Sequence, residues 1–416
     1  MSFVRLCTFI LLAGGASQGW AQSVPDLPDR YRDDVAGARP QPVFDPLGIR
    51  FGSFIARVDA DTELAYNSNL FGRSSEIVGD GYVSLRPSLR VNSDWGRHGV
   101  ELAGSADLTR FMRLTSQNTV EYRASASGRL EIGDRVTIRP ALELAREVEP
   151  RGTSGNRLTD SDPVIRSNLS ANVGARYEGG RVTGEVVAAL KRERYDPVRI
   201  DGVETSQALR DTDGIGGRVT ALYRVSPAIS ALVQAVGDTT SNPRPEACCS
   251  RSAHGYALLA GVRLDNRGLV AGQVAVGYRR RFFDDGGASR GLTYDARLQW
   301  YPTELLTVSL NANQEFRNSG ILASDAVLVS RQSLNLAYEM YRNLNFALQL
   351  SNEAANYRSV DTRTSLRSLY LRSSYTVSRL IQLGGFVQYS LSSSTRPSLA
   401  SRYDRKRLGV LVRFRV

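Results

Sequence analysis

The sequence predicts an all-β protein: a transmembrane antiparallel up-and-down β-barrel of about 18 strands, with both termini on the periplasmic side. Apolar and polar residues alternate with a period of two from Phe51 to the last residue. Each alternating segment is about ten residues or longer, which suits a tilted membrane-spanning strand. Short and long connections alternate strictly between the segments, as an outer-membrane barrel requires.

The amino terminus has the features of a cleaved secretory signal over residues 1–21. Arg5 provides a positive charge, an apolar run follows, and residues 19–21 end in a small alanine, so Gln22 is the expected mature start. A membrane anchor is the alternative, but the apolar run is well below the roughly 20 residues that a spanning helix needs. The protein is therefore expected in the cell outer membrane after export.

Residues 22–48 follow neither a helical nor a strand period and contain five prolines, among them Pro40 and Pro46. We expect a Pro-rich periplasmic extension that serves as a flexible tail, as a plug of the barrel mouth, or as a contact for a partner. The barrel domain is expected over residues 49–416, and its first strand already alternates, with Asp59, Asp61 and Glu63 between apolar neighbours.

The connections fall into two classes. The short ones have tight-turn chemistry and centre on 96–97, 133–134, 179–180, 226–227, 266–268, 302–304, 342–343 and 378–379. The long ones are polar and lie near 67–80, 113–118, 149–163, 195–211, 238–253, 283–290, 317–328, 356–364 and 393–402. A soluble propeller or a β-helix is the competing architecture, because the turns recur at a blade-like spacing. Each interval holds two long strands rather than four short ones, which favours the barrel.

Composition limits the chemistry. Lys+Arg number 53 against 42 Asp+Glu, a net charge of +11, and Lys191 and Lys406 are the only lysines. Three cysteines are too few for a disulfide scaffold, and His98 and His254 leave little for a metal site or a catalytic triad. We therefore expect no cofactor, no metal and no nucleic-acid partner. The arginine excess fits anion traffic, and it fits equally a GC-rich genome.

If the apolar face of each strand lies against lipid, the opposite face lines the lumen. The candidate lumen-lining residues are Arg57, Arg86, Arg90, Arg123, Arg129, Arg166, Arg176, Arg218, Arg263, Arg279, Arg297 and Arg331. Such groups lower the barrier for anions in a narrow channel. The alternative is that lumenal carboxylates pair with them across neighbouring strands and merely hold the barrel's shape. Rim arginines such as Arg113, Arg151, Arg194, Arg251 and Arg290 are further candidates, for phosphate groups of lipopolysaccharide.

Two adjacent cysteines, Cys248 and Cys249, stand in a long polar loop. An oxidising compartment allows them a vicinal disulfide or bonds to a partner, and chance occurrence explains them equally well. His254 lies near them beside Ser250 and Ser252, without an orienting carboxylate at a recognisable spacing. An outer-membrane hydrolase is therefore only a distant alternative, and we expect that the protein is not an enzyme.

Three segments resemble the putative beta-barrel porin 2 family of Gram-negative outer-membrane proteins: residues 43–54 with 65–71, residues 277–282, and residues 298–305. The resemblance implies an outer-membrane channel involved in export of exopolysaccharide or capsule, or in passage of anionic saccharides. A general diffusion porin with a mild anion preference is the alternative. The expected partners are outer-membrane lipid and lipopolysaccharide, the outer-membrane assembly machinery, and periplasmic polysaccharide-export components.

Overall fold

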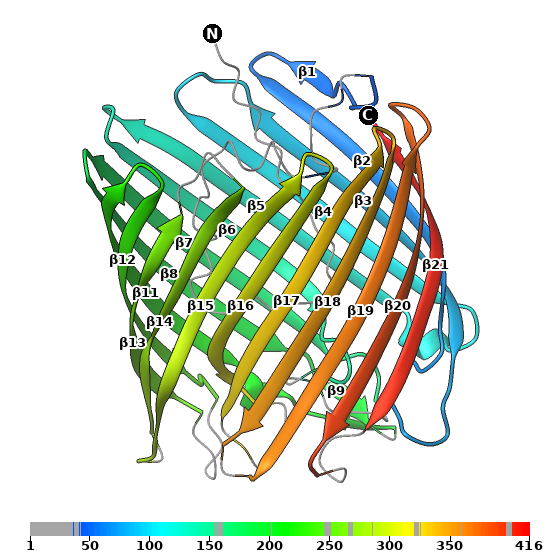
Figure 1. The fold of residues 1–416 in the computed structure, drawn as a ribbon. Helices are drawn as coiled ribbons and strands as arrows, with labels where there is room; N and C mark the ends of the chain where they lie inside the picture. The colour runs from blue at the N-terminus through cyan, green and yellow to red at the C-terminus, as the bar shows by residue number, and fades with distance from the viewer. Residues whose placement is uncertain are drawn as a thin grey trace.

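A computed structural model describes residues 36, 41, 43–153, 156, 161–200, 202–244, 251–264, 269–284, 286–319, 324, 326–358, 360–396 and 402–416. The expected signal peptide and the Cys248–Cys249 pair lie outside these residues. Within them, eighteen strands pair in chain order, and the last strand pairs with the first, which closes an antiparallel barrel (Figure 1). The predicted fold class and strand number are confirmed.

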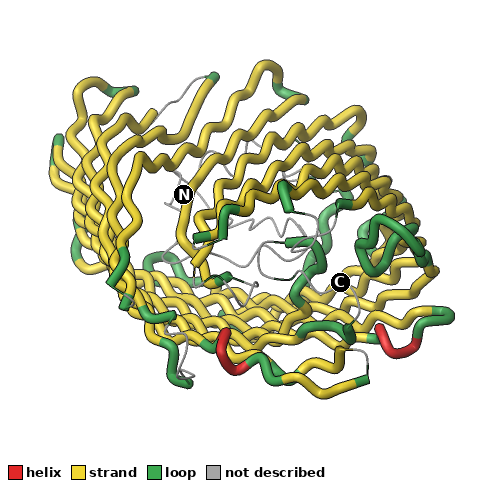
Figure 2. The backbone as a smooth tube through the Cα atoms, turned by 90° about the horizontal axis from the view of Figure 1, so that it is seen from below, coloured by secondary structure: helices red, strands yellow, loops and turns green. Residues whose placement is uncertain are grey.

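The wall strands are β2 (Phe54–Asn67), β3 (Asp80–Ser93), β4 (Gly99–Phe111), β5 (Thr119–Ile132), β6 (Val136–Val148), β7 (Ile165–Gly179), β8 (Val182–Tyr195), β11 (Thr212–Ser226), β12 (Ile229–Ser241), β13 (Ala253–Leu264), β14 (Val270–Phe283), β15 (Ala288–Thr303), β16 (Leu306–Asn318), β17 (Ala326–Tyr341), β18 (Leu344–Tyr357), β19 (Thr362–Thr376), β20 (Ile381–Ser394) and β21 (Tyr403–Arg415). They are strongly tilted against the barrel axis, as closure of a large barrel demands (Figure 1). Figure 2 shows the closed wall end on.

Short elements outside the wall were not anticipated. β1 (Ile49–Phe51) folds back on β2 through a turn at Gly52, whose φ of 56° suits glycine. β9 (Val198–Ile200) and β10 (Val203–Thr205) form a small hairpin in one long loop, and two single 3₁₀ turns, η1 (Thr115–Gln117) and η2 (Ala208–Arg210), complete the elements. No helix in the described part of the chain is long and apolar enough to span a membrane.

The short connections gather at one end of the barrel, the short-turn end, and the long ones at the other, the long-loop end (Figure 1). Two of the predicted long connections contain only four residues, and one of them, residues 358–361, joins β18 to β19. Residues 284–287 alone join β14 to β15, because Gly286 takes a φ of 84° and the backbone N–H of Phe283 donates to the carbonyl of Gly287 at 2.9 Å. Val416 and residues 43–51 both lie at the short-turn end, since Val416 pairs with Val58 in β2 and β1 continues that strand pair.

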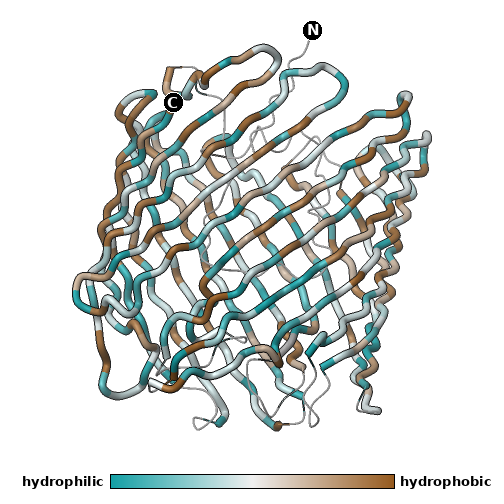
Figure 3. Tube along the Cα trace, turned by 180° about the vertical axis from the view of Figure 1, so that it is seen from behind, coloured by the Kyte–Doolittle hydropathy of each residue, from teal (hydrophilic) through white to brown (hydrophobic). Residues whose placement is uncertain are grey.

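The period of two separates an outer face from an inner face. In β2, Glu63 is 5% exposed and its neighbour Leu64 is 49% exposed. In β21, Leu411 is 5% exposed and Val410 is 61% exposed. Side chains that point outward have no protein to cover them, so large exposed hydrophobic residues mark the lipid-facing wall (Figure 3).

The wall curves tightly at β11 to β14, which we call the narrow side, and part of the inner face is apolar there. Leu222, Leu232, Ala257, Leu259 and Ala275 form a buried cluster there. Two glycines allow the neighbouring strands on this side to pack closely. A Cβ atom at Gly261 would lie 1.9 Å from the Val274 carbonyl oxygen, and a Cβ atom at Gly277 would lie 1.9 Å from the Leu258 carbonyl oxygen. Neighbouring backbones therefore approach too closely for any larger residue.

Candidate functional site: the charged inner wall

The register places all the predicted lumen-lining arginines on the inner face, with the carboxylates on the same face of neighbouring strands. Most of them make ion pairs. The pairs among the predicted residues are Arg86 with Glu63, Arg90 with Glu101, Arg123 with Glu143 and Glu147, Arg129 with Glu131, Arg166 with Glu147 and Glu193, Arg176 with Glu178 and Glu185, Arg263 with Glu185, Arg297 with Asp295, and Arg331 with Glu315 and Glu353. Neighbouring strands therefore neutralise much of the wall.

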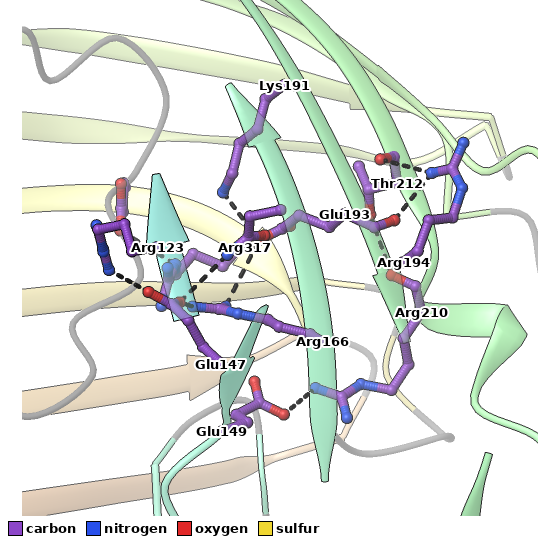
Figure 4. Close-up of polar contacts among 12 residues, drawn as sticks. Arg123, Glu147, Glu149, Arg166, Lys191, Glu193, Arg194, Arg210, Thr212 and Arg317 are labelled. Carbon is purple, nitrogen blue, oxygen red and sulfur yellow. Dashed lines mark hydrogen bonds and ion pairs between the residues drawn. The ribbon is translucent and has the colours of Figure 1, made fainter. Parts of the chain in front are cut away.

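The densest ion-pair network crosses β5 to β8 (Figure 4). Arg166 is 4% exposed and lies between two carboxylates, with Nη2 3.0 Å from Glu147 Oε2 and Nη1 3.5 Å from Glu193 Oε1. Arg123 binds the other oxygen of Glu147, and Lys191 Nζ lies 2.9 Å from Glu193 Oε1. Each carboxylate is thus shared between two cations, which locks four strands together on the inner face.

Two further groups of ion pairs join strands outside β5 to β8. Asp61 in β2 accepts two hydrogen bonds from Arg413 in β21, at 2.5 and 2.6 Å, across the seam where the barrel closes. On β16 to β18, Arg331 lies between Glu315 at 2.5 Å and Glu353 at 2.9 Å. The bidentate geometry at the seam joins the first wall strand to the last.

Three of the predicted residues, Arg57, Arg218 and Arg279, have no ion-pair partner in the part of the chain that the structure describes. Arg218 and Arg279 stand on the narrow side, in β11 and β14. The structure thus divides the predicted set: most of the arginines brace the wall, and a minority present free charge to the lumen.

The narrow side also contains an arginine-lined cavity near the short-turn end. Its lining is Arg176, Arg181, Thr183, Leu222, Arg224, Ser230 and Arg263. Arg263 reaches from β13 to Glu185 on β8, at 3.3 Å, although two strands separate β8 from β13 in the wall. Arg181 and Arg224 are exposed and have no ion-pair partner among the described residues. The guanidinium groups of this cavity can hydrogen-bond to carboxylate or phosphate oxygens, and its hydroxyl groups can hydrogen-bond to other hydroxyls.

The expected extension contacts the barrel at the short-turn end. Ala36 is 2% exposed, and its backbone N–H donates to Thr307 Oγ1 on β16 at 2.9 Å. The carbonyl of Val43 accepts from Arg379 Nε at 3.1 Å, and that of Phe44 accepts from Arg415 Nη2 at 3.0 Å. The described residues of the extension therefore contact the short-turn end at β16, at the turn after β19 and at β21.

At the long-loop end, the loops contact one another and the wall. Arg210 Nη2 donates to Glu149 Oε2, which links the loop after β8 to the loop after β6. The loop after β6 also reaches β21, where Tyr403 Oη donates to the Arg151 carbonyl at 3.3 Å. Burial, with the nearby charge of Arg405, lowers the pKa of Arg151 to about 10, so this guanidinium stays protonated at neutral pH.

The suggested rim arginines are therefore divided. Arg151 Nη2 donates to Gln117 Oε1 at 2.7 Å, and Arg251, which is 4% exposed, donates to the Ser319 carbonyl at 2.6 Å. Arg113 and Arg194 pair with Asp80 and Asp213. Only Arg290 of this set is exposed and without a partner among the described residues.

Neither histidine makes an ion pair with a carboxylate among the described residues. His254 stacks on Phe282 with ring centroids 5.1 Å apart. His98 accepts from the Glu131 backbone N–H at 3.3 Å. The described part of the chain holds no cluster of His, Cys, Asp and Glu that could bind a metal ion.

Sequence reasoning missed several members of the inner wall, including Glu147, Glu193, Arg407 and Arg413. The period of two could have found them, because they alternate with apolar residues like the rest. No sequence signal indicates the contact of Ala36 with Thr307, which joins segments 271 residues apart.

The sequence model of the family described as "Putative beta-barrel porin 2" matches residues 41–416. Among solved structures, OpdK of Pseudomonas aeruginosa with vanillate is similar at 12% identity over 87% of this chain and 99% of that one, with a TM-score of 0.44. An anion-selective porin from Comamonas acidovorans is similar at 12% identity over 88% and 99%, with a TM-score of 0.40. The copper transporter OprC is similar at 12% identity over 91% and 82%, with a TM-score of 0.46. No curated protein matches the chain.

Proposed function

The chain belongs to the putative beta-barrel porin 2 family, and on that premise we propose that this outer-membrane, porin-like barrel conducts anionic saccharides. We place the short-turn end in the periplasm, because outer-membrane barrels have short periplasmic turns and long outer loops. The finer role is export of acidic exopolysaccharide or capsule chains, which would enter at the short-turn end.

The arginine-lined cavity is the observation that carries this proposal. It lies near the end where a periplasmic polymer would arrive, and Arg181 and Arg224 offer it charge that no described carboxylate neutralises. Guanidinium groups bind carboxylate and phosphate in a bidentate manner, and the hydroxyls of Thr183 and Ser230 can exchange hydrogen bonds with a sugar. A diffusion porin with a mild anion preference remains the second candidate, because most inner-wall arginines are already paired.

Single-channel recording in planar bilayers tests the saccharide proposal. Acidic oligosaccharides such as oligogalacturonates, added on the short-turn side, should block the wild-type current at lower concentration than neutral oligosaccharides of equal length. The double variant Arg181→Gln/Arg224→Gln should lose most of that difference. Arg97→Gln/Arg342→Gln, which removes two charges from other turns at the same end, should retain it. Equal block by acidic and neutral sugars in the wild type would leave the diffusion porin as the better account.

The extension provides a second test. Deleting residues 22–44 removes the backbone groups that bind Thr307, Arg379 and Arg415, so conductance should rise severalfold if the segment obstructs the mouth. The deletion leaves β1 and the wall strands intact. Thr307→Val removes only the hydroxyl that accepts from Ala36 and should raise conductance less. Unchanged conductance together with lost polymer export in cells would instead assign the extension to a periplasmic partner.

A further inference from the structure

Charged residues on the outer face of the barrel gather at its long-loop end. The outward-facing cations of the strands, read from the register, are Arg110, Arg146, Arg192, Arg194, Arg280, Arg290, Arg363, Arg367 and Lys406. Each lies in the half of its strand nearer the long loops. In the other half, the described outward positions carry no charged residue, as in β21, where Leu408, Val410, Val412 and Phe414 alternate outward. A hydrocarbon band thus ends where the cations begin.

Two of these cations oppose each other directly. Arg280 on β14 and Arg290 on β15 are register partners, so their side chains leave the same face side by side. Like charges at directly opposite positions destabilise a strand pair. Neither guanidinium has a carboxylate within ion-pair distance among the described residues, and Arg280 Nε is buried without a hydrogen-bond partner. The Phe282 ring, 4.5 Å from the Arg280 guanidinium carbon, adds no negative charge.

Apolar groups adjoin this pair on the side of the hydrocarbon band. Tyr278 and Leu292 form the next outward row of the same two strands, and they are 43% and 84% exposed. The exposed fraction of Leu292 is large because β15 pairs with β16 only from Asp295 onward. The preceding residues of β15 therefore lie at an open strand edge. The short connection 284–287 leaves little loop to cover the patch.

We propose that this β14–β15 patch, formed by Tyr278, Arg280, Arg290 and Leu292, binds the phosphorylated headgroup of lipopolysaccharide in the outer leaflet. Phosphate oxygens between the two guanidinium groups turn a repulsive pair into a bridged one, and arginine binds phosphate in a bidentate manner. The acyl chains then cover Leu292 and Tyr278. Phosphate and acyl chain together explain why the cations face outward rather than into the lumen. This site is independent of what the channel conducts.

Binding of bisphosphorylated lipid A to the purified full-length barrel in detergent micelles tests the proposal, with lipid A lacking both phosphates as the comparison. The wild type should bind the phosphorylated form at least tenfold more tightly. Arg280→Gln/Arg290→Gln should lose most of that preference, and Arg280→Lys/Arg290→Lys should retain part of it, because lysine keeps the charge without the guanidinium fork. Arg97→Gln/Arg342→Gln, which removes two charges at the short-turn end, should bind like the wild type.

Three results would overturn the proposal. Equal binding by the glutamine double variant and the wild type would remove the pair from the site. Equal loss in the control variant would reduce the effect to net charge. Displacement of lipid A by inorganic pyrophosphate at an equal concentration would indicate a site for soluble anions rather than for a lipid. Heat-modifiable gel migration of each variant verifies that the barrel is folded, so a loss of binding can be assigned to the patch.

Discussion

Arginine stands in two contrasting settings in this barrel. On the inner wall, Arg166 lies almost completely buried between Glu147 and Glu193, and its charge is matched strand by strand. On the outer wall, Arg280 and Arg290 oppose each other with no carboxylate near them in the described chain. The difference teaches that the same side chain braces the fold where the neighbouring strand supplies a carboxylate, and that the outward pair, which lacks one among the described residues, is the place where we propose an external anion binds.

The largest expected effect comes from breaking the inner network. Arg166→Met leaves Glu147 and Glu193, which are half-buried, with one cation each instead of two, which should lower the free energy of unfolding by about 3 kcal/mol. Urea titration in detergent micelles, followed by tryptophan fluorescence, measures the loss. Arg110→Met is the control, because the partners of Arg110 within the described chain are just the carbonyls of Thr109 and Thr119. Similar losses in the two variants would contradict the contrast between a bracing arginine and a surface one.

The smallest expected effect has the opposite sign. Arg290→Gln removes one member of the outward like-charge pair, so in micelles free of lipopolysaccharide it should raise the free energy of unfolding by about 0.5 kcal/mol. The same titration applies, and added phosphorylated lipid A should reverse the order, since only the wild type then gains the bridge. A destabilised Arg290→Gln variant in lipid-free micelles would mean that the pair is already neutralised within the protein.

Much of the fold was predictable, because successive residues of a barrel strand face lipid and lumen in turn, and this alternation is visible in the sequence. The alternation of Leu64 with Glu63 already separates lipid from lumen, and a tight turn such as Gly133-Asp134 already marks a strand reversal. The short connections 284–287 and 358–361 were predicted too long because polar residues at the strand ends, such as Ser289 and Arg290 in β15 and Arg363 in β19, resemble a loop. Polarity near the long-loop end marks a strand end beyond the hydrocarbon band as readily as it marks a connection.

The candidate site was less predictable. Alternation assigns Arg218 and Arg166 to the same face, yet only the register shows that one is free and the other is held by two carboxylates. The arginine-lined cavity depends on the tight curvature at β11 to β14, which brings Arg263 to Glu185 across two intervening strands. Curvature is a property of the closed sheet, so the sequence of a single strand does not predict it.

The sequence by itself determined the barrel, its strand number and the face on which each residue stands, because those follow from a local period of two and from turn chemistry. The tertiary structure decided which charges cancel, where the wall curves tightly and which strands the described residues of the extension contact. Those features depend on pairings between residues far apart in the chain, such as Asp61 with Arg413 and Ala36 with Thr307. Closure of the sheet fixes them, and no local pattern encodes them.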